Sequence, residues 1–212
     1  LTDNSPLLTP STVNENAEQQ GNPEESRKRL KKILVSGVGF FSDAYDLFII
    51  NIVMVIIGRD HNITDADKSA ISSAALIGAI IGQIFFGLLA DKIGRKKGFV
   101  ATLTLVVLGA ILSTLSFEYK WITIVISLAF FRTVLGIGIG GEYPLSATIT
   151  SESATTQSRG RMVSAVFSMQ GIGSLVASLV GLILIVALKD DFELMWRLAL
   201  GIGAVPGLLS MY

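Results

Sequence analysis

The sequence has no cysteine and only one histidine among its 212 residues. The lack of cysteine excludes a disulfide framework, thiol chemistry and any cysteine-based metal site in this sequence. Cysteine usage therefore gives no indication of the redox compartment. His61 stands among polar residues with no other metal ligands clustered nearby, so we expect a solvated side chain and no metal site. The sequence also offers no nucleophile–base pair, so we expect neither an enzyme nor a cofactor.

Charge is scarce as well. Charged residues make up 16% of the sequence, against roughly 25% in an average soluble domain, and the formal net charge is zero. A neutral chain offers no electrostatic attraction to nucleic acid, so we expect no nucleic-acid partner. Hydrophobic residues make up 50% of the chain and its mean hydropathy is +0.61, which together indicate a protein of the lipid bilayer.

Six long hydrophobic runs account for this composition. Each is close to the ~20 residues that cross ~30 Å of hydrocarbon at 1.5 Å per residue. Because lipid offers no hydrogen-bond partner to free backbone groups, each run must be a helix. The sequence therefore predicts an all-α membrane protein with a bundle over residues 33–212, whose helices lie at about 33–58, 70–90, 98–117, 121–148, 162–188 and 194–212.

The first 32 residues are expected to form a disordered cytoplasmic tail with a basic juxtamembrane end. Residues 1–26 are rich in polar residues and show no apolar periodicity, so they cannot bury enough surface to fold. Asp3 with Leu7 and Leu8 fits an acidic dileucine sorting signal, and a chance match is the alternative. The first residue is leucine and the last residues lie inside an apolar run, so we expect a piece of a longer protein.

The lysines and arginines that flank the runs predict the orientation in the membrane. Five lie in the tail, four after the second run and two after the fourth, which makes eleven on one side against five on the other. The N-terminus is therefore expected to be cytoplasmic. We expect a multi-pass protein of the plasma membrane, with the vacuolar or lysosomal membrane as the alternative. The sequon Asn62-Ile63-Thr64 then lies outside, and its short loop favours an unused site.

Two aspartates interrupt the first run, in the segment GFFSDAYDLFIIN. Asp43 and Asp46 are three residues apart and so share one face of a helix. Two carboxylates in a low-dielectric site repel each other, and desolvation favours the neutral acid, which is the property that a proton carrier needs. The alternative is that both only line a water-filled cavity or pair with a cation. We favour proton handling.

The fourth run is unusually polar between Arg132 and Glu152, in RTVLGIGIGGEYPLSATITSE. A charged residue at bilayer depth costs about 2.5–3.5 kcal/mol on insertion scales, so Arg132 and Glu142 need a reason to be there. Gly136 and Gly140 are four residues apart and allow a neighbouring helix to approach closely. Pro144 interrupts the backbone ladder and can free carbonyl groups toward a cavity.

Tyr143, and Gln170 in the fifth run, are candidate ligands for an anion. A phenol and an amide donate hydrogen bonds without fully neutralising the charge, which suits a phosphate. The alternative is a hydrogen bond between helices. Gln170, Ser174 and Ser178 recur every four residues on one helical face, and this line either faces a pathway or packs.

The connection after the second run has the spacing G-x-x-x-D-x-x-G-R-K-K, from Gly87 through Asp91, Gly94 and Arg95. The glycines allow a tight turn, and the aspartate can pair with a cation or cap a helix start. This run resembles the loop 2–3 signature of the major facilitator superfamily of transporters. The resemblance implies a gating role on the cytoplasmic side for these four residues.

Two further features resemble the same superfamily. One is an arginine early in helix 4 followed by glycines, as in Arg132 and the glycines after it. The other is a glutamate after helix 4 that pairs with an arginine before helix 5, matched here by Glu152 and Arg159. The resemblance implies gating or structural roles for these residues. The alternative for Glu152 and Arg159 is that they only cap helices at the surface.

The segment GGEYPLSATI closely resembles the helix 4 signature GGDYPLSATI of the phosphate:proton symporter family, and DAYDLFIIN is typical of that family. The resemblance implies proton coupling by Asp43, Asp46 and Glu142, and phosphate binding by Tyr143 and Gln170. Glu142 is a departure, because the family usually has aspartate there. Related organophosphate carriers also use GGEYP, which leaves an organic substrate open.

The resemblance spans nearly all of residues 33–212. It implies the N-terminal six-helix half of a twelve-helix transporter, with the missing C-terminal six-helix half as its partner. The function it implies is proton-coupled uptake of inorganic phosphate by alternating access, with the proton gradient as the energy source. The alternatives are a glycerophosphodiester, organic anion or sugar transporter of the same superfamily, or a phosphate-sensing transceptor.

Overall fold

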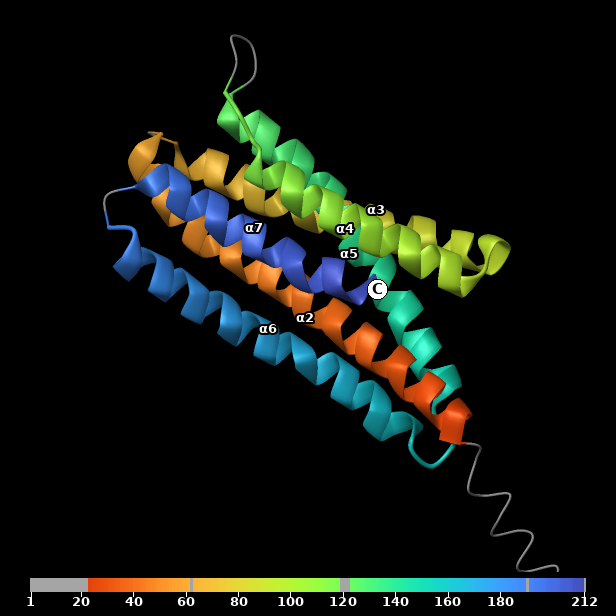
Figure 1. The fold of residues 1–212 in the computed structure, drawn as a ribbon. Coiled ribbons are helices and arrows are strands. Elements are labelled where there is room, and N and C mark those ends of the chain that lie inside the picture. The colour runs from red at the N-terminus through yellow and green to blue at the C-terminus, as the bar shows by residue number, and fades with distance from the viewer. Residues whose placement is uncertain (1–22, 62, 119–122, 190, 212) are drawn as a thin grey trace, which may run out of the picture.

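In the computed structural model, the described residues are 23–61, 63–118, 123–189 and 191–211. Within these ranges the chain forms helices and no strand, and the helices lie side by side in one bundle (Figure 1). Six of them are long and apolar enough to cross a membrane. The predicted all-α class with six spans is confirmed. The helices are α2 (Pro23–Asp60), α3 (Asp65–Ile93), α4 (Arg95–Thr114), α5 (Ile124–Ser153), α6 (Arg159–Ala187) and α7 (Phe192–Ser210).

The start of α2 corrects one expectation. The helix begins at Pro23 rather than at residue 33, so residues 23–32 are helical instead of belonging to an unstructured tail. Proline suits a first helical turn because its missing N–H would be unpaired there anyway. Glu24 forms an ion pair with Lys28 at 2.8 Å, one turn along the same helix. Residues 1–22, with the dileucine match, lie outside the described residues.

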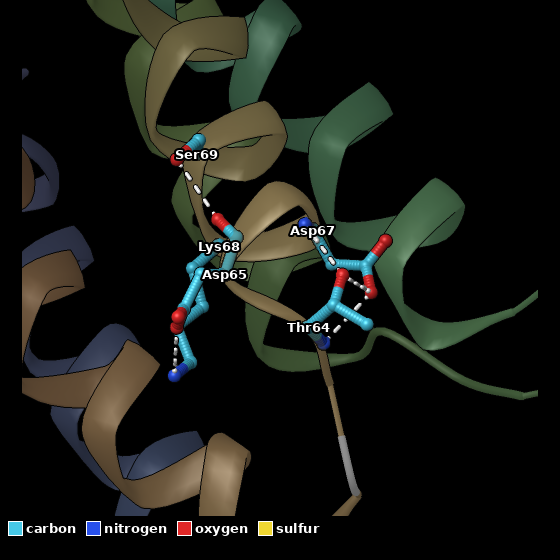
Figure 2. A network of polar contacts seen from close by, with 5 residues as sticks. All are labelled: Thr64, Asp65, Asp67, Lys68 and Ser69. Carbon is cyan, nitrogen blue, oxygen red and sulfur yellow. Dashed lines mark hydrogen bonds and ion pairs between the residues drawn. The ribbon is translucent and has the colours of Figure 1, made fainter.

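A capping box sets the start of α3, ahead of the expected residue 70 (Figure 2). The Thr64 hydroxyl accepts a hydrogen bond from the Asp67 N–H at 3.2 Å, and the Thr64 N–H donates to the Asp67 carboxylate at 2.9 Å. These bonds satisfy backbone donors that the first turn of a helix leaves unpaired. Thr64 is the third residue of the sequon, whose Asn62 lies outside the described residues.

Small residues allow α5 to pack tightly between α3 and α4. A methyl group at Gly136 or Gly140 would overlap the carbonyl oxygen of Ala75 or Ala79 in α3. On the other side of α5, a methyl group at Gly138 would lie 2.7 Å from the Val106 N atom of α4. The prediction that these glycines serve close helix packing is confirmed.

The remaining helices enclose α2. Figure 1 shows α6 at one edge of the bundle and α3 with α4 at the other. Tyr45 of α2 donates a hydrogen bond to the Ala199 carbonyl of α7 at 2.8 Å. Arg197 of α7 donates to the carbonyl oxygens of Thr114 and Ser116, at 2.6 and 3.1 Å, and so holds the end of α4. The polar residues Asp43 and Asp46, near the middle of α2, are buried among these helices.

Candidate functional site

Three carboxyl groups lie inside the bundle. Asp43 and Asp46 of α2 and Glu142 of α5 are each 0% exposed. Among the described residues, none of their carboxyl oxygens has a hydrogen-bond partner. Asp43 is close enough to Glu142 and Asp46 to interact with both electrostatically. Like charges at such a site disfavour one another, so the three acids form a cluster that is suited to holding protons.

Two glycines make room for these acids. A methyl group at Gly39 of α2 would overlap Oε1 of Glu142, and one at Gly203 of α7 would overlap Oδ1 of Asp46. The sequence interpretation missed both residues. Each is an ordinary glycine within an apolar run, and its importance depends on which side chain lies opposite. No local signal in the sequence could have identified them.

Arg132 of α5 lies beside Asp46 of α2. Its side chain is 1% exposed, and its Nη1 donates to the backbone carbonyl of Asp46 at 2.9 Å. Its Nε and Nη2 make no hydrogen bond within the described residues, and the guanidinium interacts electrostatically with the Asp46 carboxyl group. The sequence interpretation gave Arg132 a gating or structural role. The structure places it with the buried acids.

Tyr143 and Gln170 meet between α5 and α6. The Gln170 side-chain amide donates a hydrogen bond to the Tyr143 hydroxyl, and both residues are partly exposed. Phe40 packs against the Tyr143 ring with centroids 4.8 Å apart, and against Phe167 with centroids 4.5 Å apart. Because the sequence predicts substrate binding by these two residues, we call the surface formed by Tyr143 and Gln170 the substrate face, a name that stands for that prediction. It adjoins Glu142 along the chain.

The serines that follow Gln170 are engaged locally. The Ser174 hydroxyl donates to the Gly171 carbonyl and the Ser178 hydroxyl to the Ser174 carbonyl, both at 3.0 Å. Serine hydroxyls in helices commonly bond their own backbone in this way. The geometry therefore gives these serines no distinct site.

The connection between α3 and α4 is a single residue. Gly94 has φ +90°, a conformation that side chains disfavour, and its N–H donates to the Ala90 carbonyl at 3.0 Å. The next residue, Arg95, forms an ion pair with Glu152 in the last turn of α5. This part of the loop motif therefore joins the ends of three helices, α3, α4 and α5.

Three other residues of the predicted gating set lie apart. The expected pair between Glu152 and Arg159 is not formed, because Glu152 pairs with Arg95 while Arg159 donates to the Ser151 carbonyl at 3.1 Å. Asp91 is exposed, and within the described residues it has no hydrogen bond or ion pair. Gly87 has no atom close enough to restrict a side chain at its position.

Within the described ranges, no group of three or more histidine, aspartate or glutamate side chains is arranged so that it could hold a metal ion. The acid cluster combines three buried carboxyl groups with the Arg132 guanidinium beside Asp46. The chemistry it can perform is the binding and release of a proton next to a surface of hydrogen-bond donors.

Comparisons with known proteins identify the family. Residues 12–212 match the family model described as sugar (and other) transporter. The chain is 40% identical over 207 residues to the probable inorganic phosphate transporter 1-6 of Arabidopsis thaliana, covering 85% of this chain and 40% of that protein. It is 45% identical over 207 residues to the low affinity inorganic phosphate transporter 8 of Medicago truncatula, covering 85% and 37%.

The fold also matches a solved transporter. The major facilitator superfamily proton:xylose symporter XylE superposes with a TM-score of 0.75 at 21% identity, over 88% of this chain and 44% of that one. The predicted fold, a six-helix half of a major facilitator transporter, is confirmed. The chain spans about two fifths of the length of the curated relatives it matches. It is a multi-pass membrane protein and belongs to the sugar (and other) transporter family of the major facilitator superfamily.

Proposed function

We propose that the protein containing this chain takes up inorganic phosphate together with protons by alternating access. The observation that carries the proposal is the adjacency of Glu142 and Tyr143. One side chain joins the buried acid cluster, and its neighbour forms the substrate face with Gln170. The names of the two plant relatives support phosphate as the substrate, and the proton symport named for XylE supports the coupling ion.

The donors of the substrate face suit a phosphate oxygen. In the present arrangement Gln170 donates to the Tyr143 hydroxyl. An arriving phosphate would take the place of that contact and accept from both side chains, whose donors are neutral. Neutral donors hold the anion without trapping it, which a carrier needs in order to release its substrate.

Protonation of the acid cluster would reduce its repulsion of the incoming anion. Glu142 and Asp43 are close enough to influence each other, so an ionised pair would raise the potential energy of a phosphate nearby. A proton bound to either acid removes one of these charges. We infer that proton and phosphate bind together for this reason, and that both leave together on the other side of the membrane.

Arg132 would serve as the internal counter-charge of Asp46. An unpaired buried charge is strongly unfavourable, so the guanidinium favours an ionised Asp46 while the other acids exchange protons. On this proposal Arg132 takes part in coupling rather than in gating.

We assign gating to the ion pair of Arg95 and Glu152, which ties α4 to α5 at one end of the bundle. Gly94 would fix the turn, while Gly87, Asp91 and Arg159 would act only in a second conformation. The excess of basic residues supports a cytoplasmic location for this end and for the N-terminus. We propose the plasma membrane as the site of uptake, and a carrier role without enzymatic activity or cofactor.

The experiment is phosphate uptake by the full-length protein in liposomes. An inward proton gradient should drive accumulation of labelled phosphate, and Glu142→Gln should abolish it because a glutamine cannot carry the proton. Equal uptake with and without the gradient would refute the coupling.

One residue favours a second candidate substrate. Glu142 occupies a position at which the phosphate signature usually has aspartate. Organophosphate carriers have glutamate at this position, as this chain does. An excess of glycerophosphodiester should leave phosphate uptake unchanged if inorganic phosphate is the substrate. Strong competition would favour the organic phosphate instead.

A further inference from the structure

One face of α5 carries a line of polar residues, and its hydroxyl residues take no part in the proposed substrate binding or gating. Glu142 is followed at intervals of four, four and three residues by Ser146, Thr150 and Ser153. At about 100° per residue these positions fall within an arc of about 80°, and they extend about 16 Å along the helix axis. We call the three hydroxyl residues the hydroxyl line. It ends at the last residue of α5.

The hydroxyl line lies inside the six-helix bundle. Glu142, Ser146 and Thr150 are 0% exposed, and Ser153 is 9% exposed. The substrate face, by contrast, is partly exposed. The helices of this chain are sufficient to bury the hydroxyl line. The line therefore lies in the interior of the bundle and is separate from the substrate face.

The first two hydroxyls of the line lack protein partners. Several other hydroxyls of α5 bond their own helix, as Thr133 does to Ala129 at 2.9 Å. The hydroxyls of Ser146 and Thr150 make no hydrogen bond to the described residues. Leaving a buried polar group unpaired is unfavourable, and a buried water molecule usually supplies the missing partner.

Helix α2 faces this line and continues its polar character. Arg132 contacts Asp46, whereas Glu142 lies against Gly39, so α2 and α5 run antiparallel. Ser36, which is buried, lies one turn before Gly39 on the same face of α2. It therefore falls at the level of the hydroxyl line, one turn closer to the end of α5.

Charged groups of the described residues lie near both ends of the line. Asp43 of α2 interacts with Glu142 at the inner end. At the outer end Arg95 of α4 pairs with Glu152, and Arg159 of α6 bonds the Ser151 carbonyl. Figure 1 shows this end of α5 and the start of α2 at the same end of the bundle. Between the two ends the line presents only neutral hydroxyls.

We propose that the hydroxyl line holds a file of water molecules through which a proton passes between Glu142 and the end of α5, separate from the phosphate route. The protonated Glu142 gives its proton to the first water as its own O–H bond breaks. Each water accepts one proton and passes on another, and one proton leaves at the helix end. Glu142 remains as a carboxylate, and a proton arriving at the cluster restores the acid. This inference rests on the proposed proton coupling at Glu142.

The test uses the full-length transporter in liposomes with the double variant Ser146→Ala/Thr150→Val, which keeps side-chain shape and removes both hydroxyls. Net phosphate uptake driven by a pH gradient should fall about 100-fold, at the low end of what positioned proton transfer contributes. Exchange of labelled for unlabelled phosphate at equal pH moves no net proton and should stay unchanged. Ser146→Ala/Thr150→Ser, which retains one hydroxyl, should recover part of the net uptake.

Thr133→Val is the matched control, because its hydroxyl is already bonded within α5. Net uptake by the double variant equal to that of the control would overturn the inference. A parallel fall of exchange and net uptake would overturn it as well, since it would indicate a packing role. If Glu142→Gln retains pH-driven accumulation, the proposed function fails first and this inference falls with it. If Glu142→Gln uncouples transport but the double variant does not, only the water file is refuted.

Discussion

Gly39→Ala tests the geometry of the acid cluster directly. The added methyl group would overlap Oε1 of Glu142 and lie 2.9 Å from its carboxyl carbon. Carbon atoms in contact are normally about 3.5–4.0 Å apart, so the carboxyl group must move by about 1 Å. The obstacle is the flexible end of a side chain and not backbone. We therefore expect the fold to persist while the acid loses its position.

A displacement of about 1 Å at a reacting group can lower a rate about 100-fold, which corresponds to about 2.7 kcal/mol. We expect a loss of up to that size in pH-driven phosphate uptake by the full-length protein in liposomes. Exchange at equal pH, which needs no net proton transfer, should change much less. Thermal unfolding in detergent should show a midpoint close to that of the wild type.

A second substitution tests the contact between residue 39 and Glu142. Glu142→Asp shortens the acid by one methylene and withdraws it from residue 39, so Gly39→Ala/Glu142→Asp should transport better than Gly39→Ala alone. Such a recovery is a coupling energy between two residues in contact. Gly160→Ala is the control, because a methyl group there meets open space. Activity of Gly39→Ala equal to that of Gly160→Ala, or a double variant no better than the single one, would refute the proposed contact.

Three further predictions concern packing and the loop motif. Gly136→Val would press its side chain on the Ala75 backbone of α3 and should lower stability by about 1–3 kcal/mol, measured as a drop in the thermal midpoint; an unchanged midpoint would contradict the tight α3–α5 contact. Gly94→Ala places a side chain at φ +90° and should cost about 1–2 kcal/mol in the same assay, whereas no loss would contradict that turn geometry. Arg95→Glu should slow phosphate uptake with little effect on stability, since a half-exposed pair contributes about 0–1 kcal/mol, and the added Glu152→Arg should restore the rate; failure of the exchange would argue against gating by this pair.

The sequence was sufficient to predict the elements of the fold. A bilayer permits only fully hydrogen-bonded segments, so six long apolar runs had to be six helices. The start of α2 was misplaced because polar composition suggested disorder. Local pairs such as Glu24 with Lys28 instead allow the helix to continue beyond the apolar run.

For the site, the sequence was informative where the chemistry is unusual for its surroundings. Asp43, Asp46 and Glu142 stood out because charge at bilayer depth is unfavourable without a function. Their assigned roles in proton coupling remain predictions. Tyr143 and Gln170 were proposed as one site from separate runs, and the structure brings them into contact.

Only the tertiary structure decided which residues face one another. It placed Arg132 beside Asp46, gave Glu152 to Arg95 instead of Arg159, and made Gly39 and Gly203 part of the acid cluster. The physical reason is that helical periodicity fixes which residues share a face but does not say which helix that face meets. Contacts between distant segments depend on how the whole bundle packs. The residues of one helix do not indicate which other helix will pack against it.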